Sequence, residues 1–186
     1  MISEKLHKGL LLIAEPSIIG DLSFNRSVIL LADHNVEGSV GFILNKPLKY
    51  TVGDLVPDIE ANFKIYNGGP VEQDNLYFIH NIPDLIPNSI EISSGIYWGG
   101  DFDQIKDLIT NYQLTEDEIK FFTGYSGWTP TQLDEELRED SWIVANNFEA
   151  DSIFSNNEQN LWREVVIGLG QRYAHIANFP ENPMLN

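Results

Sequence analysis

The stretch Ser27–Leu44, which reads SVILLADHNVEGSVGFIL, decides the fold of this chain. It contains two short apolar runs, Ser27–Ala32 and Val40–Leu44, and each has the length and composition of a buried strand. The link between them, Asp33–Gly38, is rich in residues that favour turns. The stretch therefore predicts a β-hairpin in the first quarter of the chain.

Further strands are predicted on both sides of this hairpin. Gly9–Ala14 is a third continuous apolar run, and Pro16 follows it closely. The later segments are short runs rich in aromatic and β-branched residues, which strands favour. These predicted strands are Lys64–Tyr66, Leu76–His80, Ser89–Ile92, Ile96–Trp98, Ile119–Tyr125 and Ser141–Ala145.

The clearest helix signal lies around Pro130. Thr129 is a suitable N-cap, Pro130 suits the first helical position because no amide donor is needed there, and Gln132 completes a capping box. This pattern predicts a helix over residues 130–139. Other patterns predict three more helical segments, over Val52–Val56, from Asp101 onward, and along the apolar stripe from Leu161 to Leu169.

The predicted strands and helices are mixed along the chain without regular alternation. This order favours an α+β fold over a doubly wound α/β fold. No linker or internal repeat interrupts the sequence. We therefore predict a single domain over residues 1–186, with loosely ordered ends at 1–7 and 178–186.

The chain is strongly acidic, with a formal net charge of −17 from 28 acidic and 11 basic residues. The excess is uneven, because residues 101–164 hold 15 of the acidic residues and only 4 of the basic ones. Such a surface repels phosphate backbones, and no helix-turn-helix with a basic recognition helix is visible. We expect no direct contact with nucleic acid, and a protein is the candidate partner.

Cysteine is absent, which excludes a structural disulfide, a thiolate nucleophile and a cysteine metal site. The start of the chain, Met1–Leu6, lacks the pattern of a signal peptide. The longest apolar run, Leu10–Ala14, is too short to cross a bilayer. We therefore expect a cytoplasmic protein with no membrane partner; the sequence does not specify its oligomeric state.

A serine nucleophile is the first chemistry to consider. Gly124–Gly127 reads Gly-Tyr-Ser-Gly, which resembles a nucleophile elbow that is one residue short. The elbow needs a second glycine two residues after the serine, and Trp128 occupies that place. The segment therefore favours a tight turn over a catalytic Ser126.

Metal and anion sites are also weakly supported. His34, with Asp33, His80 and a carboxylate from Asp134 or Glu136, would suit zinc or iron only if the fold brought them together. No metal-ligand spacing supports this, so the sequence predicts no metal and no cofactor. The glycines of Gly68-Gly69-Pro70 could offer amides to an anion, although a structural turn is favoured.

Several short motifs follow one another in a fixed order along the chain. They are Gly9–Ala14, Ser27–Leu31, Gly41–Pro47, Gly68–Val71 and Gly124–Trp128, followed by Gln132, Glu136 and Trp142. With this ordered set, the chain resembles the AlgH/YqgE family of bacterial proteins from about residue 8 to residue 170.

The resemblance implies a compact α+β fold in which a mixed β-sheet curls into a partly open barrel with helices packed around it. Family members carry a label as transcriptional regulators, without a known DNA-binding motif. The chain departs from the family pattern at Ser126, where alanine is frequent, and at Thr129 and Thr131, where glycine is frequent.

Polar residues at family-like positions are the candidate site residues. The candidates for catalysis are His34, Asn45 and Glu136, and those for ligand binding are Tyr125, Gln132, Gly68 and Gly69.

Two functions from different classes remain open. The first is a cytoplasmic regulatory protein that is not an enzyme and acts through a protein partner. The second is a small-molecule-binding protein or hydrolase with a groove near residues 124–136. In that alternative Glu136 is the general acid or base, and His34 or Asn45 orients the substrate.

Overall fold

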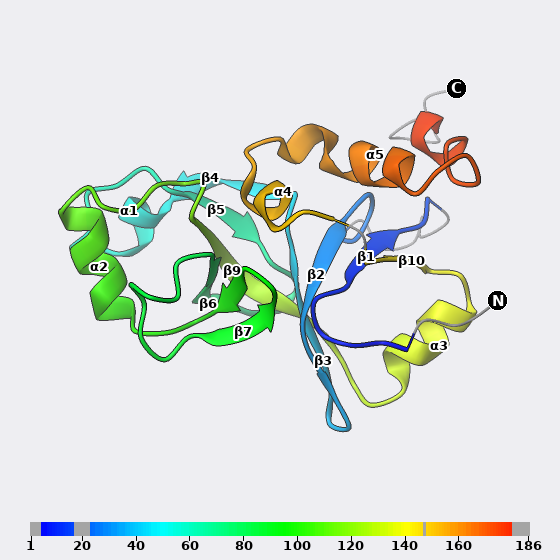
Figure 1. The fold of residues 1–186 in the computed structure, drawn as a ribbon, viewed down its shortest axis with the longest axis horizontal. Coiled ribbons are helices and arrows are strands. Elements are labelled where there is room, and N and C mark those ends of the chain that lie inside the picture. The colour runs from blue at the N-terminus through cyan, green and yellow to red at the C-terminus, as the bar shows by residue number, and fades with distance from the viewer. Residues whose placement is uncertain (1–4, 17–22, 147, 180–186) are drawn as a thin grey trace.

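The computed structural model describes residues 5–16, 23–146 and 148–179. Ten strands of this part form one sheet, and five α-helices and one 3₁₀ helix accompany it (Figure 1). The strands are β1 (Leu11–Ala14), β2 (Val28–Asn35), β3 (Gly38–Ile43), β4 (Pro47–Thr51), β5 (Lys64–Asn67), β6 (Val71–His80), β7 (Ile90–Ser93), β8 (Ile96–Trp98), β9 (Ile119–Trp128) and β10 (Trp142–Ala145). The helices are α1 (Val52–Leu55), α2 (Phe102–Thr110), α3 (Gln132–Arg138), α4 (Ala150–Phe154), α5 (Glu158–Gly168) and the 3₁₀ helix η1 (Ile176–Asn178).

The sheet runs in the order β10-β1-β2-β3-β9-β6-β8-β7 and does not close on itself. The predicted hairpin is β2–β3, and its strands pair antiparallel. One parallel pair, β5 with β9, makes the sheet mixed. The predicted fold, an α+β protein with a curled, partly open sheet, is therefore confirmed.

Strand β9 is the junction of the sheet. Its last residues pair with β3, whereas its first half lies between β5 on one side and β6 on the other. The sheet divides there into one part around β1–β3, at the centre and right of Figure 1, and another around β5–β8, to the left of it. Most residues of β9 are buried, so both of its faces are covered and its side chains must be apolar or hydrogen-bonded.

The continuous apolar runs arise because both faces of β1–β3 are covered. On β1, Leu11 and Ile13 face a core that includes Trp162 of α5, and Leu12 faces a core that includes Leu133 of α3. A strand covered by helices on both sides has no solvent face, so its residues lose the usual apolar–polar alternation. A third core packs α2 against β6 and β9.

The helix predicted over residues 130–139 begins two residues later than expected. Thr131, with φ 70°, is left-handed and precedes the first helical residue, Gln132. The Gln132 carboxamide accepts from the backbone N–H of Thr129 at 3.0 Å, as the capping box requires. The prediction placed the N-cap at Thr129 and was wrong, because the chain makes one more turn before the helix starts.

Three elements, β4, α4 and η1, were not predicted, and most of the two ends predicted to be loosely ordered lies outside the described residues. Strand β4 starts at Pro47, which reads as the end of a strand, and α4 is a single short turn of helix. The loosely ordered ends were predicted for 1–7 and 178–186, of which 1–4 and 180–186 are not described. Among the described residues, no helix is both long and apolar enough to span a bilayer.

Candidate functional site

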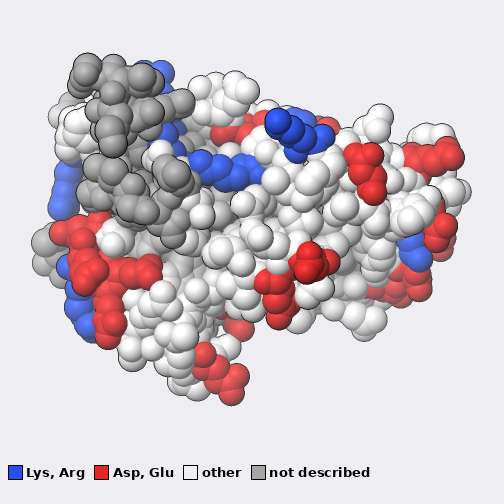
Figure 2. Space-filling view, turned by 180° about the vertical axis from the view of Figure 1, so that it is seen from behind, with Lys and Arg blue, Asp and Glu red and all other residues white. Residues whose placement is uncertain are grey.

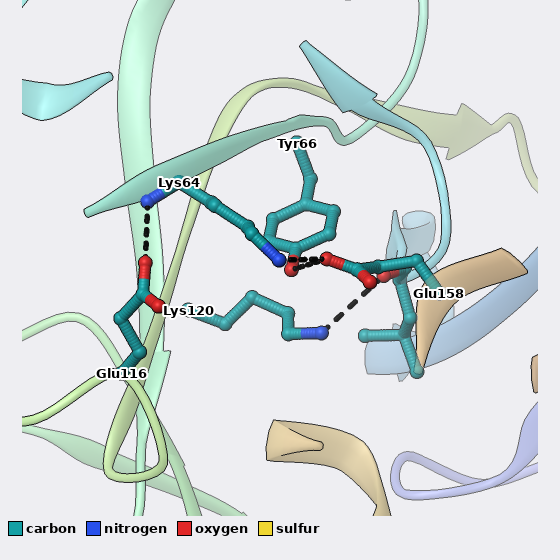
Figure 3. Close-up of polar contacts among 6 residues, drawn as sticks. Lys64, Tyr66, Glu116, Lys120 and Glu158 are labelled. Carbon is teal, nitrogen blue, oxygen red and sulfur yellow. Dashed lines mark hydrogen bonds and ion pairs between the residues drawn. The ribbon is translucent and has the colours of Figure 1, made fainter. Parts of the chain in front are cut away.

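Four ionisable side chains meet at the start of α5, where three of them approach its first residue, Glu158, as Figure 3 shows. The carboxylate of Glu158 accepts from the Lys64 ammonium at 2.8 Å and from the Tyr66 hydroxyl at 2.7 Å. The Lys120 ammonium lies 4.2 Å from the centre of the Tyr66 ring and donates to the Leu44 carbonyl at 3.4 Å. We call Lys64, Tyr66, Lys120 and Glu158 the buried cluster; Lys64 lies at its edge, with 42% of its side chain exposed.

Alternation along the strands brings these side chains together. Lys64 and Tyr66 are two residues apart on β5 and share a face of the sheet. β9 runs parallel beside β5 and supplies Lys120. Only 3% of Lys120 and 8% of Glu158 is exposed, which is rare for charged residues unless they are paired.

Burial and pairing move the pKa values of this cluster in opposite directions. Burial lowers the pKa of Lys120 to about 8, although the charge of Glu158 opposes this shift. Burial alone would raise the pKa of Glu158, but hydrogen bonds from Lys64 and Tyr66 outweigh it and hold that pKa below its usual value. Burial, and then the hydrogen bond to Glu158, raise the pKa of Tyr66.

The free energy of unfolding should rise with pH between about pH 8 and about pH 10. In this window Lys120 is neutral in the folded chain, where its pKa is about 8, but protonated in the unfolded chain, where its pKa is near 10.5. The unfolded state therefore binds more protons, and stability increases by at most about 1.4 kcal/mol per pH unit. Urea unfolding across this range checks it against Lys120→Met, which should lack this contribution; identical pH profiles would contradict it.

A polar groove of about 770 Å³ opens beside the buried cluster. Its walls include Arg26, Asn45, Lys46 and Arg163, together with Trp162 and the first turn of α5, residues 158–160. We call it the α5 groove. Three basic residues line it, whereas the one carboxylate among its described lining residues, Glu158, is bonded to Lys64 and Tyr66. The groove is thus a local concentration of positive charge in an acidic protein.

Two of the three basic residues, Arg26 and Lys46, are held in place by neighbouring groups. The Arg26 guanidinium lies 4.9 Å from the Trp162 ring centre and donates to the Phe179 carbonyl. The Lys46 ammonium donates to the Asn25 carbonyl at 2.6 Å. The indole N–H of Trp162 donates to the Ala14 carbonyl at 3.0 Å, which fixes α5 to β1. Contacts of this kind orient cations in advance of a ligand.

The structure separates the three candidate catalytic residues. Asn45 lines the α5 groove, where its carboxamide accepts from the Val28 N–H at 2.9 Å and donates to the Arg26 carbonyl at 2.8 Å. His34 lies in a second groove, of about 830 Å³, which is also lined by residues from the start of α3 and the turn before it. Its ring is 2.7 Å from the hydroxyl of Ser39, its neighbour across the hairpin.

Glu136 joins two tryptophans. Its Oε2 atom accepts from the indole N–H of Trp128 at 2.8 Å and of Trp142 at 2.7 Å, and Gln132 donates to its Oε1 at 2.9 Å. Gln132 is therefore a bridge between Glu136 and Thr129. These contacts fasten α3 to the ends of β9 and β10.

The glycine-rich segments cross at close range. A Cβ on Gly69, where φ is 151°, would lie 2.2 Å from the backbone of Tyr125. The Gly68 amide donates to the Thr123 carbonyl and the Gly69 amide to the Asn67 side chain, so both are occupied within the chain. The tight turn expected at Gly124–Gly127 is instead part of strand β9.

Other candidate residues also have structural partners. Ser126 is fully buried and donates to the Gly68 carbonyl at 3.1 Å. The Tyr125 ring packs edge-on against Tyr77. His80 is buried, and burial lowers its pKa. Within residues 5–16, 23–146 and 148–179, no three His, Asp or Glu side chains come close enough together to hold a metal ion.

Sequence reasoning missed the buried cluster and most of the α5 groove. A signal was present, because Lys120 interrupts the apolar strand pattern Ile-Lys-Phe-Phe at a position that the sheet buries. A charged residue inside such a run indicates a buried partner. Its partner, Glu158, lies on a helix far along the chain, and nothing in the local pattern points to it.

The fold and the groove define a compact α+β protein with a partly open sheet and a polar groove of ligand size. The chain belongs to the AlgH-like family, whose model matches residues 11–174. A UPF0301 protein of Chlorobium limicola is 40% identical over 184 residues, covering 98% of this chain and 97% of the relative. A UPF0301 protein of Bacteroides thetaiotaomicron is 39% identical over 181 residues, covering 96% and 91%. The family is uncharacterised, so membership assigns no specific activity.

Two solved structures share the fold. The crystal structure of protein DIP2367 from Corynebacterium diphtheriae matches with a TM-score of 0.77 and 22% identity, covering 96% of this chain and 95% of that chain. The solution structure of the AlgH protein from Pseudomonas aeruginosa matches with a TM-score of 0.73 and 21% identity, covering 97% and 98%. The resemblance to AlgH is confirmed, and at these identities the structural likeness concerns the fold alone.

Proposed function

We propose that this protein is a regulatory protein of the bacterial cytoplasm that binds a small anionic molecule in the α5 groove and acts through a protein partner. The concentration of Arg26, Lys46 and Arg163 in that one groove carries the proposal. Like charges repel, and a surface with a net charge of −17 offers no general attraction to anions. A specific anion is the ligand that such a groove favours.

The proposal combines the two functions that the sequence left open, and it moves the ligand site from the groove near residues 124–136 to the α5 groove. The groove near residues 124–136 holds His34, but its Glu136 neighbour is bonded to two indoles. A general acid or base must be within reach of its substrate, and a carboxylate already held by two donors is poorly suited to that role. Binding without a chemical step is therefore favoured over hydrolysis.

A protein partner is favoured over DNA for an electrostatic reason. Affinity for a nucleic acid comes largely from lysine and arginine contacts with phosphates along an extended surface. Here the basic residues of the groove lie within a single pocket, and residues 101–164 hold 15 acidic residues but only 4 basic ones. Regulation by this chain would then follow from a ligand-dependent contact with another protein.

Small multivalent anions should raise the melting temperature of the full chain. Sulfate, citrate and pyrophosphate, tested at constant ionic strength, should give a rise of up to about 5 °C at saturation. The variant Lys46→Gln/Arg163→Gln should lose the rise, whereas the matched variant Lys49→Gln/Arg138→Gln, which removes equal charge outside the groove, should keep it. Equal responses of the two variants, or turnover of the bound anion by the purified chain, would contradict the proposal.

A further inference from the structure

We infer that the ligand of the α5 groove is a small organic molecule that carries phosphate groups; this inference rests on the proposed function. The first argument is the amount of positive charge. Arg26, Lys46 and Arg163 line the groove, and Lys64 and Lys120 flank Glu158 on its wall. Three of the eleven basic residues of the chain therefore line one groove, and Lys64 and Lys120 lie close to the carboxylate of its wall.

The second argument is the electrostatic potential of the surface around the groove. Figure 2 shows several Lys and Arg side chains near the top of one face of the molecule, with Asp and Glu side chains beside them, below them and toward both ends. A weakly charged anion gains little from a local basic site when the rest of the surface repels it. A phosphate group carries up to about two charges at neutral pH, concentrated on three oxygens, and gains more from the same site.

The third argument is the geometry of the donors. The guanidinium of Arg163 presents a planar fork that fits two phosphate oxygens, and Lys46 adds a compact charge. The first turn of α5, an 11-residue helix, lines the same groove through residues 158–160. The amino-terminal end of a helix carries partial positive charge, which favours a bound phosphate.

The fourth argument concerns size. A groove of about 770 Å³ suits a metabolite larger than inorganic phosphate. The carboxamides of Asn25, Gln159 and Asn160 line it beside the cations and suit hydroxyl or carbonyl groups on the rest of such a molecule. A nucleic acid would extend beyond the groove onto the acidic surface, so a small molecule is favoured.

Isothermal titration of the full chain with inorganic pyrophosphate and with citrate, at equal ionic strength, tests the inference. We expect pyrophosphate to bind at least about tenfold more tightly than citrate. Arg163→Gln should weaken pyrophosphate binding at least about tenfold, because it removes the planar fork. Arg138→Gln removes the same charge from α3 and should leave the affinity unchanged.

The outcomes separate this inference from the proposed function. If citrate binds as tightly as pyrophosphate and both depend on Arg163, the phosphate inference fails and the anion site stands. If neither probe binds with a dissociation constant below about 1 mM, or if binding is unchanged in Arg163→Gln, both fail. Tight, Arg163-dependent binding of pyrophosphate alone supports both.

Discussion

Glu158→Gln should lower the free energy of unfolding at pH 7 by about 2 kcal/mol, because the buried Lys120 ammonium loses an opposite charge, whereas the Lys64 side chain is 42% exposed and its charge stays in contact with water. Glu158 is the acceptor shared by Lys64 and Tyr66, and its charge also opposes the loss of the proton from Lys120. In the variant, Lys120 keeps the Leu44 carbonyl and the Tyr66 ring as contacts of its ammonium, and neither carries a charge. Urea unfolding at pH 7 measures the change.

The control lies on the same helix. Glu164 is exposed, and it accepts from the side chain of Asn157, a bond that a glutamine oxygen also provides. We expect Glu164→Gln to change stability by less than about 0.5 kcal/mol, as exposed substitutions usually do. A loss at Glu158 no larger than this would contradict the role assigned to the buried cluster.

A second substitution tests the cause of the loss. Lys120→Met replaces the buried ammonium by an apolar side chain of similar length, so it removes the charge that Glu158→Gln leaves behind. The double variant should recover at least about 1 kcal/mol of the loss, because side chains in contact show coupling energies of that size. Additive effects would show that Lys120 and Glu158 act independently.

The fold could largely be predicted from the sequence because its signals are local. The β2–β3 hairpin follows from two apolar runs and a turn between them, and the start of α2 follows from Asp101, whose side chain accepts from two amides of the first turn. Sequence rules for helix and strand boundaries failed at two places where the rest of the fold determines the backbone conformation. The left-handed Thr131 delays α3, and β4 begins at a proline that reads as a strand end.

The candidate site could be predicted far less well, because it is assembled from distant parts of the chain. Tyr66 and Glu158 are 92 residues apart, and their hydrogen bond exists only because α5 packs onto the sheet. Polar residues that the sequence singled out as possible site residues instead make structural hydrogen bonds. Asn45 accepts from the first residue of β2, Val28, and Ser126 donates to the Gly68 carbonyl. Such positions hold the sheet together, and a single sequence does not distinguish this role from ligand binding.

Glu136 is the clearest example of a candidate site residue whose contacts are structural. Its carboxylate is the acceptor for the indoles of Trp128 and Trp142, both only 6% exposed. Glu136→Ala should lower the free energy of unfolding by about 3 kcal/mol, since each hydrogen bond to a charged acceptor contributes about 1.5 kcal/mol or more and two buried donors are left unpaired. Urea unfolding, with near-ultraviolet circular dichroism as a second signal for the two indoles, measures the effect.

Two further variants separate a structural role from a chemical one. Glu136→Gln keeps an oxygen for the indoles but turns an amide toward the donor of Gln132, so we expect a smaller loss of about 1 kcal/mol. Glu135→Ala, one residue away and exposed, should cost less than about 0.5 kcal/mol. If Glu136 anchors the two indoles, the loss of stability should be largest for Glu136→Ala, smaller for Glu136→Gln and smallest for Glu135→Ala. If Glu136→Ala is as stable as the wild type, the Glu136 carboxylate is not needed to anchor the two indoles. The acid–base role would then again be open to Glu136, and the groove beside His34 would again be the candidate ligand site.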